Sequence, residues 1–186
     1  NKILFSHSYF MRFDPKQWST GKPYPPLATL YAAALMRQNG YETAIFDTMF
    51  VADPEAVLPA IEANAPRFFV VYDDGFNYLT KMCLTNMREA AFRMCKLAKE
   101  KDCMVIVSSS DSTDHYREYL EQGADFVIIG EAEQTLLELI DHISGGKEDF
   151  NSIAGLAFKA EDQIVKTTAR TVIKDLDILP LPPGIW

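Results

Sequence analysis

Five short apolar runs alternate with five longer segments of helical period along this chain, and this alternation limits the fold more than any other feature. The apolar runs are nearly continuous in β-branched and aromatic residues, as expected of strands that are buried on both faces of a parallel sheet. They cover Lys2–Ser6, Glu42–Asp47, Phe68–Asp73, Met104–Ser108 and Phe126–Ile129. The helical segments cover Pro26–Gln38, Pro54–Asn64, Leu79–Lys101, Thr113–Gln122 and Glu131–Ile143. The pattern predicts an α/β domain with a five-stranded parallel sheet and helices on both faces.

The connection between the first strand and the first helix, residues 6–24, is longer than the roughly two to six residues that usually join a strand to a helix. We interpret it as a loop, either a cover over a ligand site or an insertion without fixed structure. Its aromatic side chains suit two uses, because they could cover a flat ligand or pack against another domain. These residues are Tyr9, Phe10, Trp18 and Tyr24.

The last forty residues differ in pattern from the rest of the chain. Ile153–Lys159 and Gln163–Thr168 alternate around a polar turn, which predicts a β-hairpin appended to the domain. The segment from Asp175 to Pro183 is rich in proline, which cannot continue a helix, and it is typical of a linker. The predicted organisation is an α/β domain over residues 1–146, the hairpin over 147–170, and over 171–186 a linker to a further domain.

Charge and cysteine content exclude several classes of protein. The 186 residues carry a formal net charge of −8, and the most basic stretch, residues 88–101, is interleaved with acidic residues. We therefore expect neither nucleic acid nor a membrane surface as a partner. The three cysteines, Cys83, Cys95 and Cys103, are too widely spaced for a zinc or iron–sulfur motif, and they indicate a reducing, cytoplasmic setting.

The carboxyl ends of the predicted strands are the expected ligand site, because open α/β sheets bind their ligands there. Small and polar residues recur at these positions, and they permit close approach of a ligand and hydrogen bonding to it. Strand-to-helix turns favour the same residue types without any ligand, so composition alone leaves the question open. The candidates by position are Ser8, Thr48, Gly75, Ser108, Ser109, Gly130 and Glu131.

Two common functions of such sheets are disfavoured by these strand ends. A dinucleotide or P-loop site needs a glycine-rich motif that is missing after the first strand. A phosphoacceptor receiver domain could use Asp73 and Ser108. It would also need an acidic pair after the first strand and a lysine after the fifth, where the chain has Ser6-His7-Ser8 and Gly130-Glu131.

Four phrases occur in an order that matches a known family. They are Pro25-Pro26-Leu27 through Leu35, Gly130-Glu131-Ala132-Glu133-Gln134-Thr135-Leu136, Ile153-Ala154-Gly155-Leu156-Ala157-Phe158 and Asp175-Leu176-Asp177-Ile178-Leu179-Pro180-Leu181-Pro182. Together they resemble the N-terminal cobalamin-binding domain of cobalamin-dependent radical S-adenosylmethionine proteins. The resemblance covers nearly the whole chain.

This resemblance implies a flavodoxin-like (Rossmann-like), doubly wound sheet of strand order 2-1-3-4-5. Cobalamin (vitamin B12) would lie with its corrin over the strand ends and its nucleotide tail between sheet and helices. S-adenosylmethionine and a 4Fe-4S cluster would belong to a C-terminal radical domain of the same polypeptide. The chain itself would carry the cofactor for methyl transfer or related radical chemistry and have no catalytic residue of its own.

The chain also departs from related cobalamin modules. The DxHxxG motif, whose histidine ligates cobalt in other modules, is missing, so we expect a base-off cobalamin without a histidine ligand and interpret His7 as a loop residue. Ser108-Ser109 replaces a glycine pair, and Asp73-Asp74 replaces small hydroxyl residues. Both changes leave open an alternative, a degenerate docking or regulatory domain that does not bind cobalamin.

Overall fold

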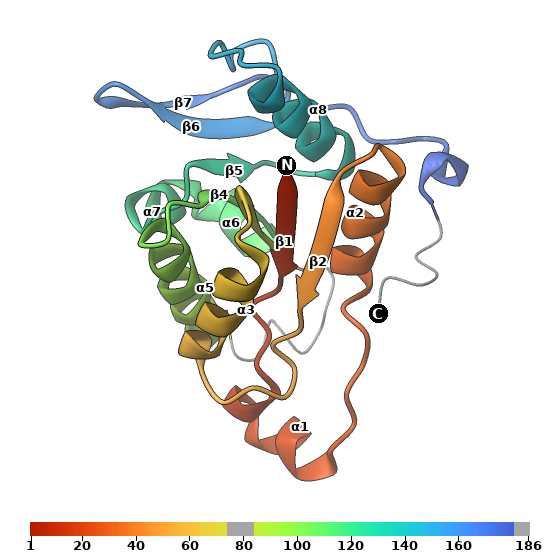
Figure 1. Ribbon diagram of the computed structural model, residues 1–186, viewed down its shortest axis with the longest axis vertical. Helices are drawn as coiled ribbons and strands as arrows, with labels where there is room; N and C mark the ends of the chain where they lie inside the picture. Colours follow the sequence, from red (N-terminus) through yellow and green to blue (C-terminus); the bar gives the residue numbers. More distant parts are fainter. Residues whose placement is uncertain (74–83, 181–186) are drawn as a thin grey trace.

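The computed structural model describes residues 1–73 and 84–180 and places one mixed β-sheet at the centre of the chain (Figure 1). In the described residues the sheet has seven strands in the order β2-β1-β3-β4-β5-β6-β7. The strands are β1 (Lys2–Ser6), β2 (Glu42–Phe46), β3 (Phe68–Tyr72), β4 (Met104–Ser108), β5 (Phe126–Ile128), β6 (Leu156–Ala160) and β7 (Gln163–Lys166). Strands β1 to β5 are parallel, in the order expected from the resemblance.

The sheet differs from the expected five-stranded one, because the two strands of the predicted hairpin belong to it. Strand β6 pairs antiparallel with β5, with Leu156 opposite Ile128 and Phe158 opposite Phe126. The hairpin is therefore part of one seven-stranded sheet and does not lie beside a five-stranded one. The physical reason is the unpaired edge of β5, which β6 covers with backbone hydrogen bonds and with three buried side chains, Leu156, Ala157 and Phe158.

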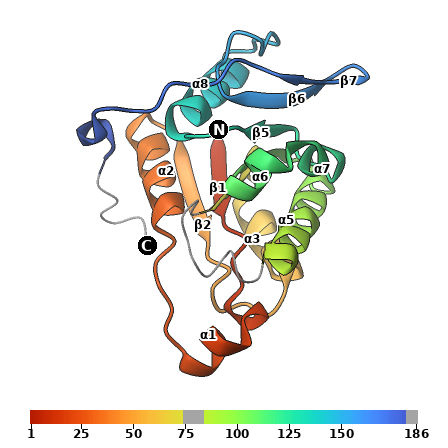
Figure 2. The same ribbon diagram turned by 180° about the vertical axis from the view of Figure 1, so that it is seen from behind.

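Helices cover both faces of the sheet, as predicted (Figures 1 and 2). On one face, α2 (Leu27–Gln38) and α8 (Glu133–Ser144) pack on β-strand side chains such as Ile3 and Phe5. On the other face, α3 (Val57–Asn64), α5 (Leu84–Lys99) and α7 (Tyr116–Glu121) share a core with Leu4. Because successive residues of β1 point to opposite apolar layers, its three central residues, Ile3, Leu4 and Phe5, are all hydrophobic.

Several predicted element boundaries need correction. The segment predicted as the helix Pro54–Asn64 begins with a 3₁₀ turn, η2 (Pro54–Ala56), before α3. The segment predicted as the helix Thr113–Gln122 is divided into α6 (Ser110–Asp114) and α7, because His115 leaves the helical conformation at φ −111° and ψ 27°. The start of the predicted helix Leu79–Lys101 lies outside the described residues.

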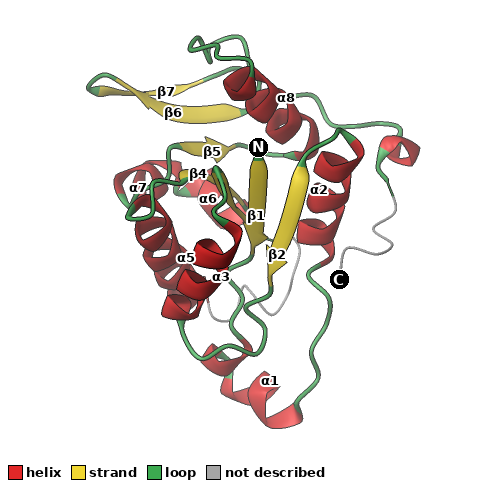
Figure 3. Ribbon diagram, viewed as in Figure 1, coloured by secondary structure: helices red, strands yellow, loops and turns green. Residues whose placement is uncertain are grey.

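The segment expected as a long irregular loop contains regular structure. Residues 6–24 include η1 (Met11–Phe13) and α1 (Pro15–Thr20), which lie beyond the carboxyl ends of β1 and β2 (Figure 3). Asp14 caps α1 by accepting hydrogen bonds from the backbone N–H groups of Lys16 and Gln17, both at 3.1 Å, and Pro15 fits the first helical position.

The aromatic residues of this segment do not share one role. Tyr9 and Phe10 are buried within the chain, whereas Trp18 is 42% exposed and lies under the guanidinium of Arg12, at 4.7 Å. Of these three, only Trp18 therefore presents a large surface to a ligand or another domain. Among residues 1–73 and 84–180, no helix has the length and apolar character needed to cross a membrane.

Candidate functional site

The parallel register aligns the carboxyl ends of the first strands at one edge of the sheet. Ser6 of β1 pairs with Phe46 of β2, and Tyr72 of β3 pairs with Ser108 of β4. The residues that follow these strands must therefore lie side by side. We call this the carboxyl edge and define it by residues 7–8, 47–48, 73, 108–110 and 129–130.

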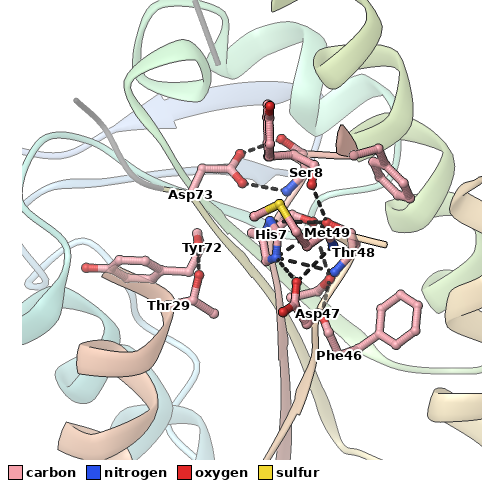
Figure 4. Close-up of polar contacts among 12 residues, drawn as sticks. His7, Ser8, Thr29, Phe46, Asp47, Thr48, Met49, Tyr72 and Asp73 are labelled. Carbon is pink, nitrogen blue, oxygen red and sulfur yellow. Dashed lines mark hydrogen bonds and ion pairs between the residues drawn. The ribbon is translucent and has the colours of Figure 1, made fainter. Parts of the chain in front are cut away.

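His7 is buried at the carboxyl edge and is fixed by the residues after β2 (Figure 4). Its Nε2 atom lies 2.8 Å from Asp47 Oδ1, and its Nδ1 atom lies 3.1 Å from Thr48 Oγ1. His7 does lie in a loop, but it is only 3% exposed and both ring nitrogens contact protein atoms. The imidazole is therefore engaged within the chain and is not presented to a metal.

Asp47 is the anionic partner in this contact. Burial by itself raises the pKa of its carboxyl, but hydrogen bonds from His7 and from the backbone N–H of Met49, the latter at 2.8 Å, act in the opposite direction. The net effect places the pKa of Asp47 below its ordinary value. Asp47 is thus ionised at neutral pH, and its charge is directed toward His7 and Met49.

Ser8 is fixed in a similar way by the residue after β3. Its backbone N–H donates to Asp73 Oδ1 at 2.5 Å, and its hydroxyl donates to Oδ2 at 2.7 Å (Figure 4). Asp73 is only 9% exposed. Asp73, which replaces a small hydroxyl residue of related modules, therefore joins the loop that follows β1 to the end of β3.

Replacing Asp73 with alanine is expected to lower the free energy of unfolding by about 2 kcal/mol, because two hydrogen bonds to a charged group are lost and the Ser8 N–H stays buried. Ser8→Ala removes only the hydroxyl bond and serves as the matched control, with an expected loss of about 1 kcal/mol. Urea unfolding followed by circular dichroism measures both. A loss from Asp73→Ala no larger than that from Ser8→Ala would contradict this role.

Thr48 also holds the loop that follows β1. Its side chain is fully buried, and Oγ1 lies 3.0 Å from the carbonyl oxygen of His7 and 2.9 Å from that of Tyr9. The hydroxyls of Ser8 and Thr48, two predicted ligand contacts, are thus used within the protein. Their role in the structure is to shape the backbone of the carboxyl edge.

The predicted residues after β4 lie at the same edge. Ser108 is buried, and its carbonyl accepts the N–H of Asp73 at 2.9 Å. Ser109 begins α6 with a capping box: its hydroxyl accepts from Ser112 N at 2.8 Å, and its own N–H donates to the Ser112 hydroxyl at 2.9 Å. Ser110 is the first serine of this run whose side chain is exposed.

The predicted residues after β5 divide between the edge and the C-terminal segment. Gly130 is exposed with φ +81°, its N–H donates to Thr113 Oγ1 at 3.3 Å, and a Cβ atom placed on it would meet open space. Glu131 instead accepts the backbone N–H of Ile173 at 2.8 Å. Gly75, the remaining predicted site residue, lies outside the described residues, as does Asp74.

A largely buried ionic cluster, which the sequence did not predict, lies next to the carboxyl edge. Arg88 of α5 donates two hydrogen bonds to Asp111 of α6, from Nε at 2.8 Å and from Nη2 at 2.5 Å. The hydroxyl of Tyr119 in α7 donates to the same carboxylate at 2.9 Å. Burial, with the nearby charges of Asp111 and Asp73, raises the pKa of Tyr119, which stays protonated. Asp111 therefore joins three helices next to the Ser108–Ser110 turn.

A groove lies between the first turns of α2 and α8, beside the carboxyl edge. Its volume is about 690 Å³, and its lining combines apolar side chains with two carboxylates. The lining residues are Leu27, Ala28, Tyr31, Glu133, Leu176, Asp177 and Leu179. The last three belong to or follow η3 (Leu176–Ile178), within the segment that the sequence suggested was only a linker.

The part of the chain that the structure describes contains no group of three or more histidine, cysteine or acidic side chains able to hold a metal ion.

In a comparison with protein families, the B12 binding domain matches residues 19–140 of this chain. Two curated proteins are similar in sequence. The anaerobic magnesium-protoporphyrin IX monomethyl ester cyclase of Synechocystis sp. is 24% identical over 160 residues, covering 83% of this chain and 30% of that protein. An uncharacterized methyltransferase of Pyrococcus horikoshii is 24% identical over 166 residues, covering 87% and 34%. The chain thus spans about a third of the length of these relatives.

Solved structures share the fold. The radical S-adenosylmethionine methyltransferase TsrM from Kitasatospora setae, with cobalamin and a [4Fe-4S] cluster bound, matches with a TM-score of 0.68 at 19% identity, covering 97% of this chain and 31% of that one. The cobalamin-dependent S-adenosylmethionine radical enzyme OxsB, with aqua-cobalamin and S-adenosylmethionine bound, matches with a TM-score of 0.66 at 13% identity, covering 92% and 22%.

Proposed function

Because this chain belongs to the B12 binding domain family, we propose that it holds cobalamin at its carboxyl edge as the cofactor module of a longer radical S-adenosylmethionine protein. The family match over residues 19–140 carries the proposal. The shared fold with two cobalamin-containing enzymes supports it. These findings do not favour the alternative of a degenerate docking domain without cobalamin.

The remainder of the proposed protein would be a C-terminal radical domain that holds S-adenosylmethionine and a 4Fe-4S cluster. Relatives about three times as long as the matched region support this part of the proposal. Residues 171–186 would be the linker to that domain. Cys95 and Cys103 are buried thiols far from any cluster-binding spacing, so the described part of this chain offers no place for the cluster.

The residues of the carboxyl edge fit a corrinoid. The corrin periphery carries neutral amides, which need hydrogen-bonding groups and do not need a strong opposite charge. Among the described residues of the carboxyl edge, the carboxylates of Asp47 and Asp73 already accept hydrogen bonds from His7, Met49 and Ser8, which reduces their repulsion of a ligand. Open space beside Gly130 permits close approach to the backbone. We propose Ser108, Ser109 and Gly130 as contact residues, with Ser8 and Thr48 fixing the loop behind them.

Bound cobalamin would supply a cobalt centre that carries a methyl group or an electron. The chain's own contribution would be to bind and orient the corrin and to exclude water from the space between the corrin and the carboxyl edge. His7 takes no part as a ligand, because Asp47 and Thr48 occupy both of its nitrogens. This supports binding of cobalamin without a histidine ligand; the base-off state is a separate part of the proposal, which the absorption spectrum tests.

The purified chain, mixed with hydroxocobalamin and then desalted, is expected to retain the colour with a base-off absorption spectrum. His7→Gln keeps a donor for Asp47 and removes the imidazole, so the bound spectrum should stay unchanged. His115→Gln, at the half-exposed junction between α6 and α7, is the matched control. Loss of all colour from the wild-type chain would contradict cobalamin binding, and a spectral change in His7→Gln alone would identify His7 as a cobalt ligand.

A further inference from the structure

The segment after the hairpin is held along α8. We call residues 170–179 the strap. The guanidinium of Arg170 is largely buried, donates from Nε to Thr135 Oγ1 at 2.6 Å and forms an ion pair with Glu138. Further along, the N–H of Ile173 donates to Glu131 at 2.8 Å. Residues 131, 135 and 138 flank or lie on the first two turns of α8, so these contacts direct the strap toward the carboxyl edge.

The last residues of the strap form one wall of the groove between α2 and α8. Leu176, Asp177 and Leu179 face α2, where Leu27 and Tyr31 form the opposite wall. Asp175 fixes the bend by accepting the N–H of Asp177 at 3.1 Å. Without the strap the groove would be an open surface between two helices, so the strap is what gives it a second side.

The chemistry of the lining indicates what would fill the groove. Leucine and tyrosine side chains suit a flat aromatic base, and the carboxylates of Glu133 and Asp177 can accept hydrogen bonds from ribose hydroxyls. The same carboxylates disfavour a phosphate inside the groove. A volume of about 690 Å³ is sufficient for a ribonucleoside. Because α2 and α8 both begin at the carboxyl edge, a corrin held there could place such a group in the groove.

We propose that the strap determines specificity for corrinoids that carry a nucleotide, by closing the groove over the base and ribose. This inference rests on the proposed function. The strap lies outside the matched region, residues 19–140, and its anchors Arg170 and Glu131 contact α8 and not the ligand. Occupancy of the cofactor site would thereby also fix the position of the strap.

The test compares hydroxocobalamin with diaquocobinamide, a corrin that lacks the nucleotide. Arg170→Ala should weaken hydroxocobalamin binding about five- to tenfold, as expected for a loss of about 1 to 1.4 kcal/mol, and leave diaquocobinamide binding within about twofold. Lys174→Ala, at an exposed position in the same strap, is the matched control and should change neither. Equal weakening of both corrinoids, or no weakening of either, would overturn the role of the strap alone. Failure of the wild-type chain to bind either corrinoid would overturn the proposed function as well.

Hydrogen exchange of the wild-type chain gives a second readout that needs no variant. Hydroxocobalamin is expected to slow exchange of the backbone amides of residues 171–179, whereas diaquocobinamide is not. The amides of α3, on the opposite face of the sheet, are the internal control. Equal protection of the strap by both corrinoids would contradict closure over the nucleotide.

Discussion

Replacing Asp111 with alanine is expected to lower the free energy of unfolding by about 3 kcal/mol, the largest loss of stability that we predict for a single side chain. Asp111 receives two hydrogen bonds from Arg88 and one from Tyr119. Its removal leaves a largely buried guanidinium without its counter-ion and a buried phenol without its acceptor. Both groups would lose partners that water cannot fully replace.

The contrast with an exposed ion pair makes this prediction specific. Glu55 and Arg93 form a contact at 2.7 Å, but both side chains are largely exposed, so Glu55→Ala should leave stability close to that of the wild-type chain. Chemical denaturation of the two variants under the same conditions measures the difference. Similar stability of Asp111→Ala and Glu55→Ala would show that the buried cluster contributes little.

A tryptophan at position 110 is expected to weaken cobalamin binding at least about a hundredfold, equivalent to roughly 2.7 kcal/mol. Ser110 is exposed at the first turn of α6, directly after the Ser108–Ser109 end of β4. An indole at this position would occupy space over the carboxyl edge where the corrin is proposed to lie. Because Ser110 contributes no buried contact, the variant should fold normally.

The control for this variant is a tryptophan at the opposite end of the sheet. Ala63 is exposed in the last turn of α3, which precedes the amino end of β3. Ala63→Trp should therefore bind hydroxocobalamin as the wild-type chain does. Equilibrium titration followed by absorbance compares the two variants. Unchanged affinity in Ser110→Trp would place the cofactor somewhere other than the carboxyl edge.

The central part of the fold could be predicted because it depends on local sequence patterns. Buried parallel strands such as Phe68–Tyr72 are apolar at every position, and the helices between them keep a helical period. The pairing of β6 with β5 could not be predicted in this way, because it depends on an edge formed by a distant segment. Helix α1 was not predicted, although the sequence contains a helix-start signal for it, Asp14 followed by Pro15.

The candidate site was predicted by position and only partly by chemistry. Strand ends place Ser8, Thr48, Ser108 and Gly130 at one edge, as the fold requires. The use of their polar groups depends on partners from other segments, such as Asp73 for Ser8 and the carbonyl of Tyr9 for Thr48. Glu131 is the clearest example, since its partner Ile173 lies 42 residues further along the chain. Sequence spacing contains no information on these contacts.

The most direct test of the account is an equilibrium titration of the purified chain with hydroxocobalamin. We expect saturable binding of a single cobalamin per chain with a dissociation constant of about 1 μM or lower, which corresponds to roughly −8 kcal/mol. Binding should be at least about a hundredfold weaker in Ser110→Trp and unchanged in Ala63→Trp. The absence of saturable binding by the wild-type chain at cofactor concentrations up to about a hundred times that value, where more than 95% occupancy is expected, would contradict a cobalamin-carrying function.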